Sequence, residues 1–132
     1  MIRRETFGVN NAEFEHIGLV VKSITNSKMY ADEIIYFDPI QKVYVCFINF
    51  NGIAMELIEP EDEKSPVYLN LQKKQPLAHI CFKVKDMKLA LAEGRKQGIH
   101  AIAPPIPAVA FAGRKIAWLY NTDIGLIELV EK

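Results

Sequence analysis

Two histidines and two glutamates occupy matching places in two similar stretches of this 132-residue chain. His16 opens the first stretch and Glu56 lies near its end, and His79 and Glu128 hold the same places in the second. A glutamate flanked by apolar residues is costly to bury unless it is paired or bound to a metal. Imidazole with carboxylate suits Ni²⁺, Co²⁺, Zn²⁺, Fe²⁺ or Mn²⁺ better than Mg²⁺ or Ca²⁺, so the four residues predict a site for one such divalent ion, whose identity stays open.

The repeat supports this prediction. His-Ile-Gly-Leu-Val-Val-Lys-Ser-Ile at residues 16–24 returns as His-Ile-Cys-Phe-Lys-Val-Lys-Asp-Met at 79–87, and Ile-Ala-Met-Glu-Leu-Ile-Glu at 53–59 returns as Gly-Leu-Ile-Glu-Leu-Val-Glu at 125–131. This spacing indicates duplication of one supersecondary unit. A lone histidine in a strand is more often a hydrogen-bonded core residue than a ligand. Two equivalent pairs favour the metal site, because pseudo-symmetry brings equivalent strands together.

The local sequence pattern predicts the elements that position these residues. Strands are expected at 14–22, 43–50, 53–59, 78–85, 115–120 and 125–131, with shorter ones near 36–41 and 99–103. A helix is expected from Ser23 to about Ile35 and another over about 87–97, with Asp86 as its N-cap and Gly98 as its stop. Ser65-Pro66 predicts the start of a short helix.

These elements divide the chain into an arm (1–13), a first module (14–59), a linker (60–77) and a second module (78–132). Sixteen basic and sixteen acidic residues leave no net charge, so neither nucleic acid nor a membrane surface is an expected partner. No stretch resembles a signal peptide or a membrane span, which predicts a cytoplasmic protein. Cys46 and Cys81 are therefore expected to be reduced.

Several stretches together resemble a known family over residues 14–131. They are His-Ile-Gly-Leu-Val-Val (16–21), Met-Glu-Leu-Ile-Glu-Pro (55–60), Ser-Pro-Val (65–67), Leu-Gln-Lys-Lys (71–74), His-Ile-Cys-Phe-Lys-Val (79–84), Gly-Arg-Lys-Ile-Ala-Trp-Leu (113–119) and Leu-Ile-Glu-Leu (126–129). The chain resembles the vicinal oxygen chelate superfamily, which includes glyoxalase I, methylmalonyl-CoA epimerase and the bleomycin-resistance proteins. It looks most similar to the epimerase-like branch. The resemblance implies an α+β fold of two tandem βαβββ modules whose curved mixed sheets enclose a shared metal-containing cleft.

The resemblance also implies a function. It predicts a divalent-metal-dependent isomerase or lyase that abstracts a proton alpha to a metal-bound carbonyl, with Glu128 as the base. The small-molecule substrate would be an acyl-CoA, a thiohemiacetal or a sugar derivative, and a homodimer is expected by family habit. Methylmalonyl-CoA epimerase-like activity is the leading alternative, followed by lactoylglutathione lyase. The alternative from another class is a metal-free, ligand-sequestering protein of the bleomycin-resistance type.

The chain departs from one pattern of the family. Some epimerases place a second catalytic glutamate near the position of Tyr44, whereas no acidic residue lies between Asp38 and Glu56 here. Tyr44, Glu56 or a bound water would then be the second acid or base. Four further residues are candidates for substrate binding, and each has an ordinary alternative as a solvated or core residue: Lys83, Arg114, Lys115 and Trp118.

Overall fold

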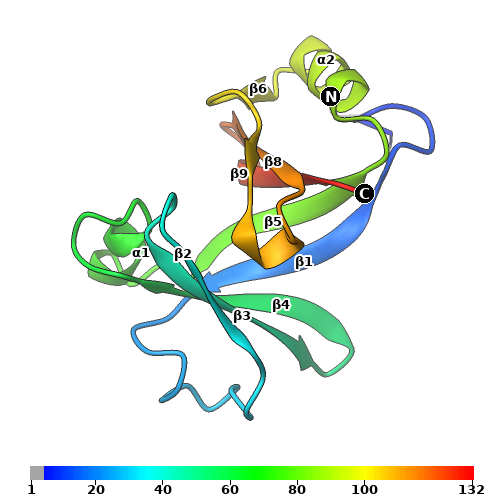
Figure 1. Ribbon diagram of the computed structural model, residues 1–132. Coiled ribbons are helices and arrows are strands. Elements are labelled where there is room, and N and C mark those ends of the chain that lie inside the picture. Colours follow the sequence, from blue (N-terminus) through cyan, green and yellow to red (C-terminus); the bar gives the residue numbers. More distant parts are fainter. Residues whose placement is uncertain (1–4) are drawn as a thin grey trace. The chain divides into compact units, whose positions relative to one another are not determined.

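The computed structural model describes residues 5–132, which form two compact units. One unit is His16–His79, and the other combines residues 5–15 with Ile80–Lys132. Strands β1 (Ala12–Val20) and β5 (Leu77–Val84) each run from one unit into the other. Both units carry mixed sheets, and helices are few (Figure 1). The expected α+β class is confirmed.

In the unit His16–His79, the strands follow the order β2 (Ile35–Asp38), β3 (Val43–Phe50), β4 (Ile53–Pro60) and β1. β3 and β4 form an antiparallel hairpin through Asn51 and Gly52, which both have positive φ (52° and 88°), as a tight primed turn requires. β4 then pairs with β1 in parallel. An Asn-Gly pair between two apolar runs is a strong local signal for such a two-residue hairpin.

One face of this sheet carries the unit's apolar core. Ile24, Cys46, Ile48 and Leu57 are buried together, with Leu19, Met29 and Tyr30 packed against them. Side chains alternate between the two faces of a strand, so the neighbours of Cys46 and Leu57 along the chain project from the opposite face. That opposite face bears His16 and Glu56.

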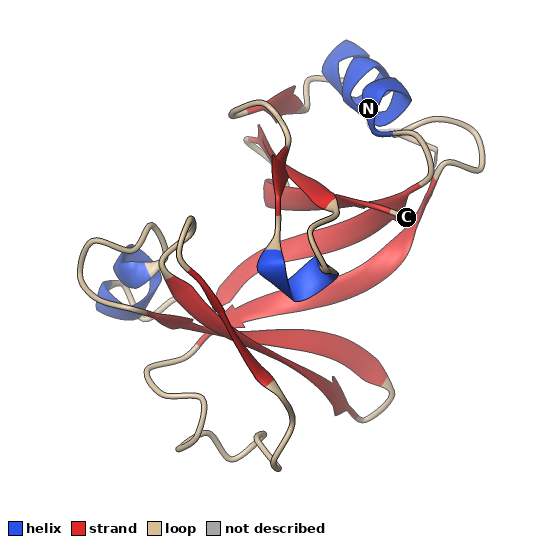
Figure 2. Cartoon of the chain, in the orientation of Figure 1, coloured by secondary structure: helices blue, strands red, loops and turns tan. Residues whose placement is uncertain are grey.

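The helix expected between Ser23 and Ile35 does not form, and this prediction was wrong. Figure 2 shows a loop throughout the connection from β1 to β2. Short polar side chains bind the backbone locally here: Ser23 Oγ accepts from the Asn26 N–H at 3.4 Å, and Ser27 Oγ accepts from the Met29 N–H at 3.2 Å. Such bonds compete with helical hydrogen bonds, and Asp32 at φ 62° is incompatible with a continuous helix.

The second unit repeats the strand order with a true helix. Its sheet runs β5, β9 (Gly125–Glu131), β8 (Lys115–Asn121) and β6 (His100–Ala101), while β7 (Ile106–Pro107) also pairs with β8. Helix α2 (Met87–Lys96) begins as expected, because the Asp86 side chain accepts a hydrogen bond from the Leu89 N–H. Its Met87 and Ala90 share a core with residues of β5, β8 and β9 such as Leu129.

Two further short helices complete the described elements. Helix α1 (Tyr68–Gln72) lies where Ser65-Pro66 predicted a helix start, and the 3-10 helix η1 (Val109–Phe111) lies in the proline- and alanine-rich loop before β8. Within residues 5–132, no helix is long and apolar enough to cross a membrane.

Residues near the N-terminus, expected to form an arm, are part of the second unit and contact its core and helix α2. Phe7 belongs to the core around α2, with its ring 5.7 Å from that of Phe82. The Asn11 side chain donates to the backbone oxygens of Phe7 and Asp86 and accepts from the Asp86 N–H. Asn11 thus ties this segment to the start of α2. Residues 1–4 of the expected arm lie outside the described residues.

Candidate metal centre

Strand pairing places His16 and Glu56 on one face of the first sheet. Gly18, two residues after His16, is the partner of Glu56 in the parallel pair of β1 and β4. Residues two apart on a strand share a face, and so do register partners on adjacent strands. His16 and Glu56 therefore project from the same side, away from the apolar core around Leu57.

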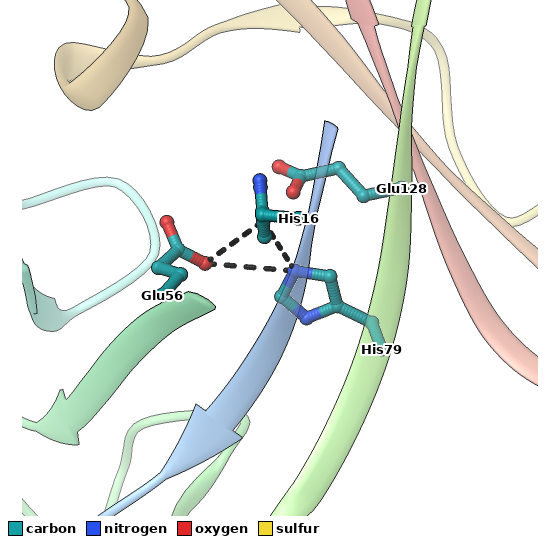
Figure 3. Close-up of side chains that lie close together, drawn as sticks. All are labelled: His16, Glu56, His79 and Glu128. Carbon is teal, nitrogen blue, oxygen red and sulfur yellow. Dashed lines mark hydrogen bonds and ion pairs between the residues drawn. The ribbon is translucent and has the colours of Figure 1, made fainter. Parts of the chain in front are cut away.

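His79 of β5 joins these two residues within the same unit (Figure 3). The Nε2 atoms of His16 and His79 are 3.1 Å apart, and each lies 3.5 Å from Oε1 of Glu56. All three side chains are buried, with relative exposures of 0% for His16, 3% for His79 and 6% for Glu56. Three ligand-type atoms thus converge in a water-poor place.

These distances fit a single metal ion. Two donor atoms bound at about 2.1 Å lie about 3.0 Å apart at a right angle and about 3.4 Å apart at a tetrahedral angle. The observed separations of 3.1 and 3.5 Å lie close to those two values. Two imidazole nitrogens and one carboxylate are also a common donor set for divalent transition metals. The three residues could therefore hold such an ion.

The second copy repeats the same register with Glu128. Cys81, two residues after His79, is the partner of Glu128 in the parallel pair of β5 and β9. This is the relation that joins His16, Gly18 and Glu56 in the first copy. Glu128 is buried, at 3% exposure. The duplication seen in the sequence is therefore preserved in the strand pairing, residue for residue.

An aromatic residue faces each glutamate across an antiparallel pair. Phe47 of β3 is the partner of Glu56, and Trp118 of β8 is the partner of Glu128. Phe47 also contacts His16 edge to face, with ring centroids 5.4 Å apart. Apolar rings beside buried ionisable groups limit their access to water. Trp118 was a candidate from its sequence context, whereas Phe47 was not, although its place opposite Glu56 in the hairpin register could have marked it.

The pairing places Tyr44 on the other face of its sheet. Tyr44 is the partner of Phe37 on β2, and the two rings lie 4.9 Å apart. It is an odd number of residues from Phe47, so it projects from the face opposite Glu56. Tyr36, the partner of Val45, shares the face of Phe47 and Glu56 instead. The tyrosine on the candidate site's face is therefore Tyr36, which the sequence analysis did not select.

Two of the three basic residues expected to bind substrate make local side-chain contacts, and the third, Lys115, is exposed. Lys83 Nζ lies 3.9 Å from Glu13 and 3.8 Å from Glu15. Arg114 donates to the backbone oxygens of Phe111 and Glu131 at 3.1 Å each, and its guanidinium lies over the Phe111 ring. Lys115 is exposed at the start of β8. The Arg114 contacts give that side chain a structural role in holding the loop before β8.

Comparison with known proteins identifies the family. Residues 15–118 match the family model of the glyoxalase/bleomycin resistance protein/dioxygenase superfamily. The chain belongs to this superfamily. It is 32% identical to the uncharacterized protein YqjC of Bacillus subtilis over 127 residues, which cover 89% of this chain and 90% of that protein. It is 30% identical to human mitochondrial methylmalonyl-CoA epimerase over 95 residues, 69% of this chain and 53% of that enzyme, so the match spans about half of the human protein.

Solved structures agree on the fold. A hypothetical protein of Bacillus halodurans superposes with a TM-score of 0.76 at 27% identity, covering 92% of this chain and 94% of that one. Methylmalonyl-CoA epimerase of Mycobacterium tuberculosis superposes with a TM-score of 0.75 at 19% identity, covering 99% of this chain and 92% of that one. The fold of this superfamily, expected from the resemblance, is confirmed.

Proposed function

We propose that this protein is a divalent-metal-dependent isomerase that moves a proton on the carbon next to a substrate carbonyl, as in acyl-CoA epimerisation. The observation that carries the proposal is the buried convergence of His16, His79 and Glu56, with Nε2 atoms 3.1 Å apart. Two relatives support the choice of reaction and substrate class: human methylmalonyl-CoA epimerase and the ethylmalonyl-CoA/methylmalonyl-CoA epimerase of Cereibacter sphaeroides.

Glu128 is proposed as the fourth ligand and as the proton acceptor. Its support is the repeated register, in which Glu128 bears the relation to His79 that Glu56 bears to His16. A carboxylate within reach of an acidic C–H can act as a general base, and such groups contribute about 10²–10⁴-fold to the rate. Trp118 beside it would form an apolar wall that excludes water from the reacting carbon.

The ion would be held by His16, Glu56, His79 and Glu128. When bound, it would act as a Lewis acid toward the carbonyl and stabilise the negative charge that develops as the proton leaves. The donor set favours Ni²⁺, Co²⁺, Zn²⁺, Fe²⁺ or Mn²⁺. The proton itself would be handled by side chains of the protein, with Glu128 as the acceptor. Tyr36, on the same face as Glu56, is the candidate for the returning acid in place of Tyr44.

Exchange of the substrate's α-proton in D₂O tests the reaction directly. Metal-loaded protein should exchange the α-proton of methylmalonyl-CoA, followed by mass spectrometry, and Glu128→Gln should reduce the rate by about 10²-fold or more. Glu131→Gln is the matched control on the same strand. The Glu131 carboxylate accepts a hydrogen bond from the Lys115 N–H, and a glutamine can accept the same bond, so the exchange rate of this variant should stay within about twofold of wild type.

The same assay separates the alternatives. Turnover of the methylglyoxal–glutathione hemithioacetal without exchange of methylmalonyl-CoA would assign a lactoylglutathione lyase instead. Loaded protein that exchanges neither substrate would contradict the proposed reaction class for these substrates, and ligand-binding screens with metal-free protein would then test the sequestering alternative.

A further inference from the structure

Gly18 lies directly beneath the His79 imidazole, where a side chain has no room. A Cβ atom built on Gly18 would be 2.2 Å from Cε1, 2.5 Å from Nδ1 and 2.7 Å from Nε2 of His79. Carbon atoms that are not bonded to each other rest at about 3.5–4.0 Å. The imidazole therefore occupies the volume that any other residue at position 18 would need.

Backbone conformation does not explain a glycine at this position. Five of the seven glycines in the chain have positive φ, and Gly18 is not one of them. It is the register partner of Glu56 in a regular parallel pair, where every residue type can adopt the backbone angles. What Gly18 provides is the absence of a side chain. The equivalent position in the second copy holds Cys81, so the repeat itself does not demand glycine there.

We infer that Gly18 is a positioning residue that fixes the His79 ring within metal-binding distance of His16 and Glu56. A Cβ at position 18 would push the ring away by more than 1 Å from contacts that now measure 3.1 and 3.5 Å. Sites of this kind need their ligands held to within about 0.5 Å. His79 is buried, so the ring can yield only by rotating away from the other ligands. The inference deepens the proposed metal site and rests on it.

A double-mutant cycle tests this role. Gly18→Ala, His79→Ala and the double variant are compared with wild type in two measurements: affinity for Co²⁺ by isothermal titration, and urea unfolding of the metal-free proteins. Gly18→Ala should weaken Co²⁺ binding by about tenfold or more, while the titration still shows one Co²⁺ ion bound per chain. In the His79→Ala background, where the metal site itself is lost, the same substitution should not change the unfolding midpoint, because the clash is gone.

Gly94→Ala is the matched control for adding a methyl group. Gly94 also lacks positive φ, and a Cβ there would lie 3.3 Å from the edge of the Phe7 ring and 3.5 Å from the Ile99 backbone oxygen, with no atom nearer. It should bind Co²⁺ like wild type.

The outcomes separate this inference from the proposed function. Equal destabilisation by Gly18→Ala with and without His79, or undiminished Co²⁺ affinity in Gly18→Ala, would overturn the positioning role. If wild type itself binds no metal, the metal site fails, and coupled unfolding midpoints would still show the contact between Gly18 and His79. If Gly18→Ala does not fold, recovery of folding in the double variant supports the inference, and continued unfolding there overturns it.

Discussion

Replacing Glu56 by leucine should stabilise the metal-free protein and abolish its response to metal. The Glu56 carboxylate is 6% exposed and has two imidazole nitrogens at 3.5 Å as neighbours. Removing a charged group from water is costly, and replacing a whole buried ion pair by apolar residues is often stabilising by about 1–4 kcal/mol. Here one carboxylate is replaced and the two imidazoles remain, so we take the lower half of that range, about 1–2 kcal/mol. The two histidines remain hydrogen-bond partners of each other at 3.1 Å, so leucine at position 56 leaves neither ring nitrogen without a partner.

The size of the effect follows from the length of the chain. About 2.1 cal/mol/K of unfolding entropy per residue gives about 0.28 kcal/mol/K for 132 residues, so 1 kcal/mol shifts the melting temperature by about 4 °C. Metal-free Glu56→Leu should then melt about 4–8 °C above metal-free wild type, taking about 1–2 kcal/mol for the substitution. Metal at about 100 times its Kd adds about 2.7 kcal/mol to the stability of wild type and raises its melting temperature by about 10 °C. Metal-loaded wild type should therefore melt above Glu56→Leu.

Differential scanning calorimetry of both proteins, with EDTA and then with excess Co²⁺, shows which of them melts at the higher temperature in each condition. Glu63→Leu is the control, because Glu63 is exposed and its replacement should change stability by less than about 0.5 kcal/mol in either condition. Glu56→Leu that melts below wild type in EDTA, or that gains as much stability from Co²⁺ as wild type does, would refute the reasoning that Glu56 is retained for metal at a cost in stability.

Three further predictions follow from single contacts. Tyr36→Phe should reduce α-proton exchange by about 10²-fold, whereas Tyr44→Phe, on the opposite face, should stay within about twofold; equal effects in the exchange assay would contradict the assignment of faces. Asn11→Ala should lower the free energy of unfolding by about 2 kcal/mol in urea titrations, because it leaves the Asp86 N–H without its acceptor; an unchanged midpoint would argue against that tie. Burial, and secondarily the charge of Glu33, raises the pKa of the Cys46 thiol above its ordinary value of 9.0. Its alkylation in the native protein should therefore be slower than that of a model thiol at pH 8, and its rate should continue to rise with pH above 9, where the rate of the model thiol levels off, as followed by mass spectrometry of the modified peptide.

Much of the fold could be predicted from local signals. Asn51-Gly52 set the hairpin, Asp86 marked the start of α2, and alternation along 125–131 marked β9. The segment after Ser23 does not form a helix, because its pattern of apolar residues is equally satisfied by a loop that buries Ile24 and packs the partly buried Met29 against the same core. Local side-chain hydrogen bonds decided between the two, and periodicity does not reveal them.

The candidate site was only partly predictable. His16, Glu56 and His79 could be selected because the repeat marks them, and the structure brings them together. The face of Tyr44 follows from the register of the β3–β4 hairpin, whereas the face of Tyr36 depends on the register of β2 on β3, which no local signal specifies. The steric need for Gly18 depends on a ring 61 residues away along the chain, so it emerges only in three dimensions.

Metal content tests the central claim most directly. Wild type, His79→Ala and His100→Ala are each incubated with Ni²⁺, Co²⁺ and Zn²⁺, desalted and measured by plasma mass spectrometry, with His100 as the control because it is the exposed third histidine of the chain. About one ion per chain in wild type and His100→Ala, lost in His79→Ala, is the predicted result. Wild type that retains no ion, or His79→Ala that retains as much as wild type, would contradict a metal centre at His16, Glu56 and His79.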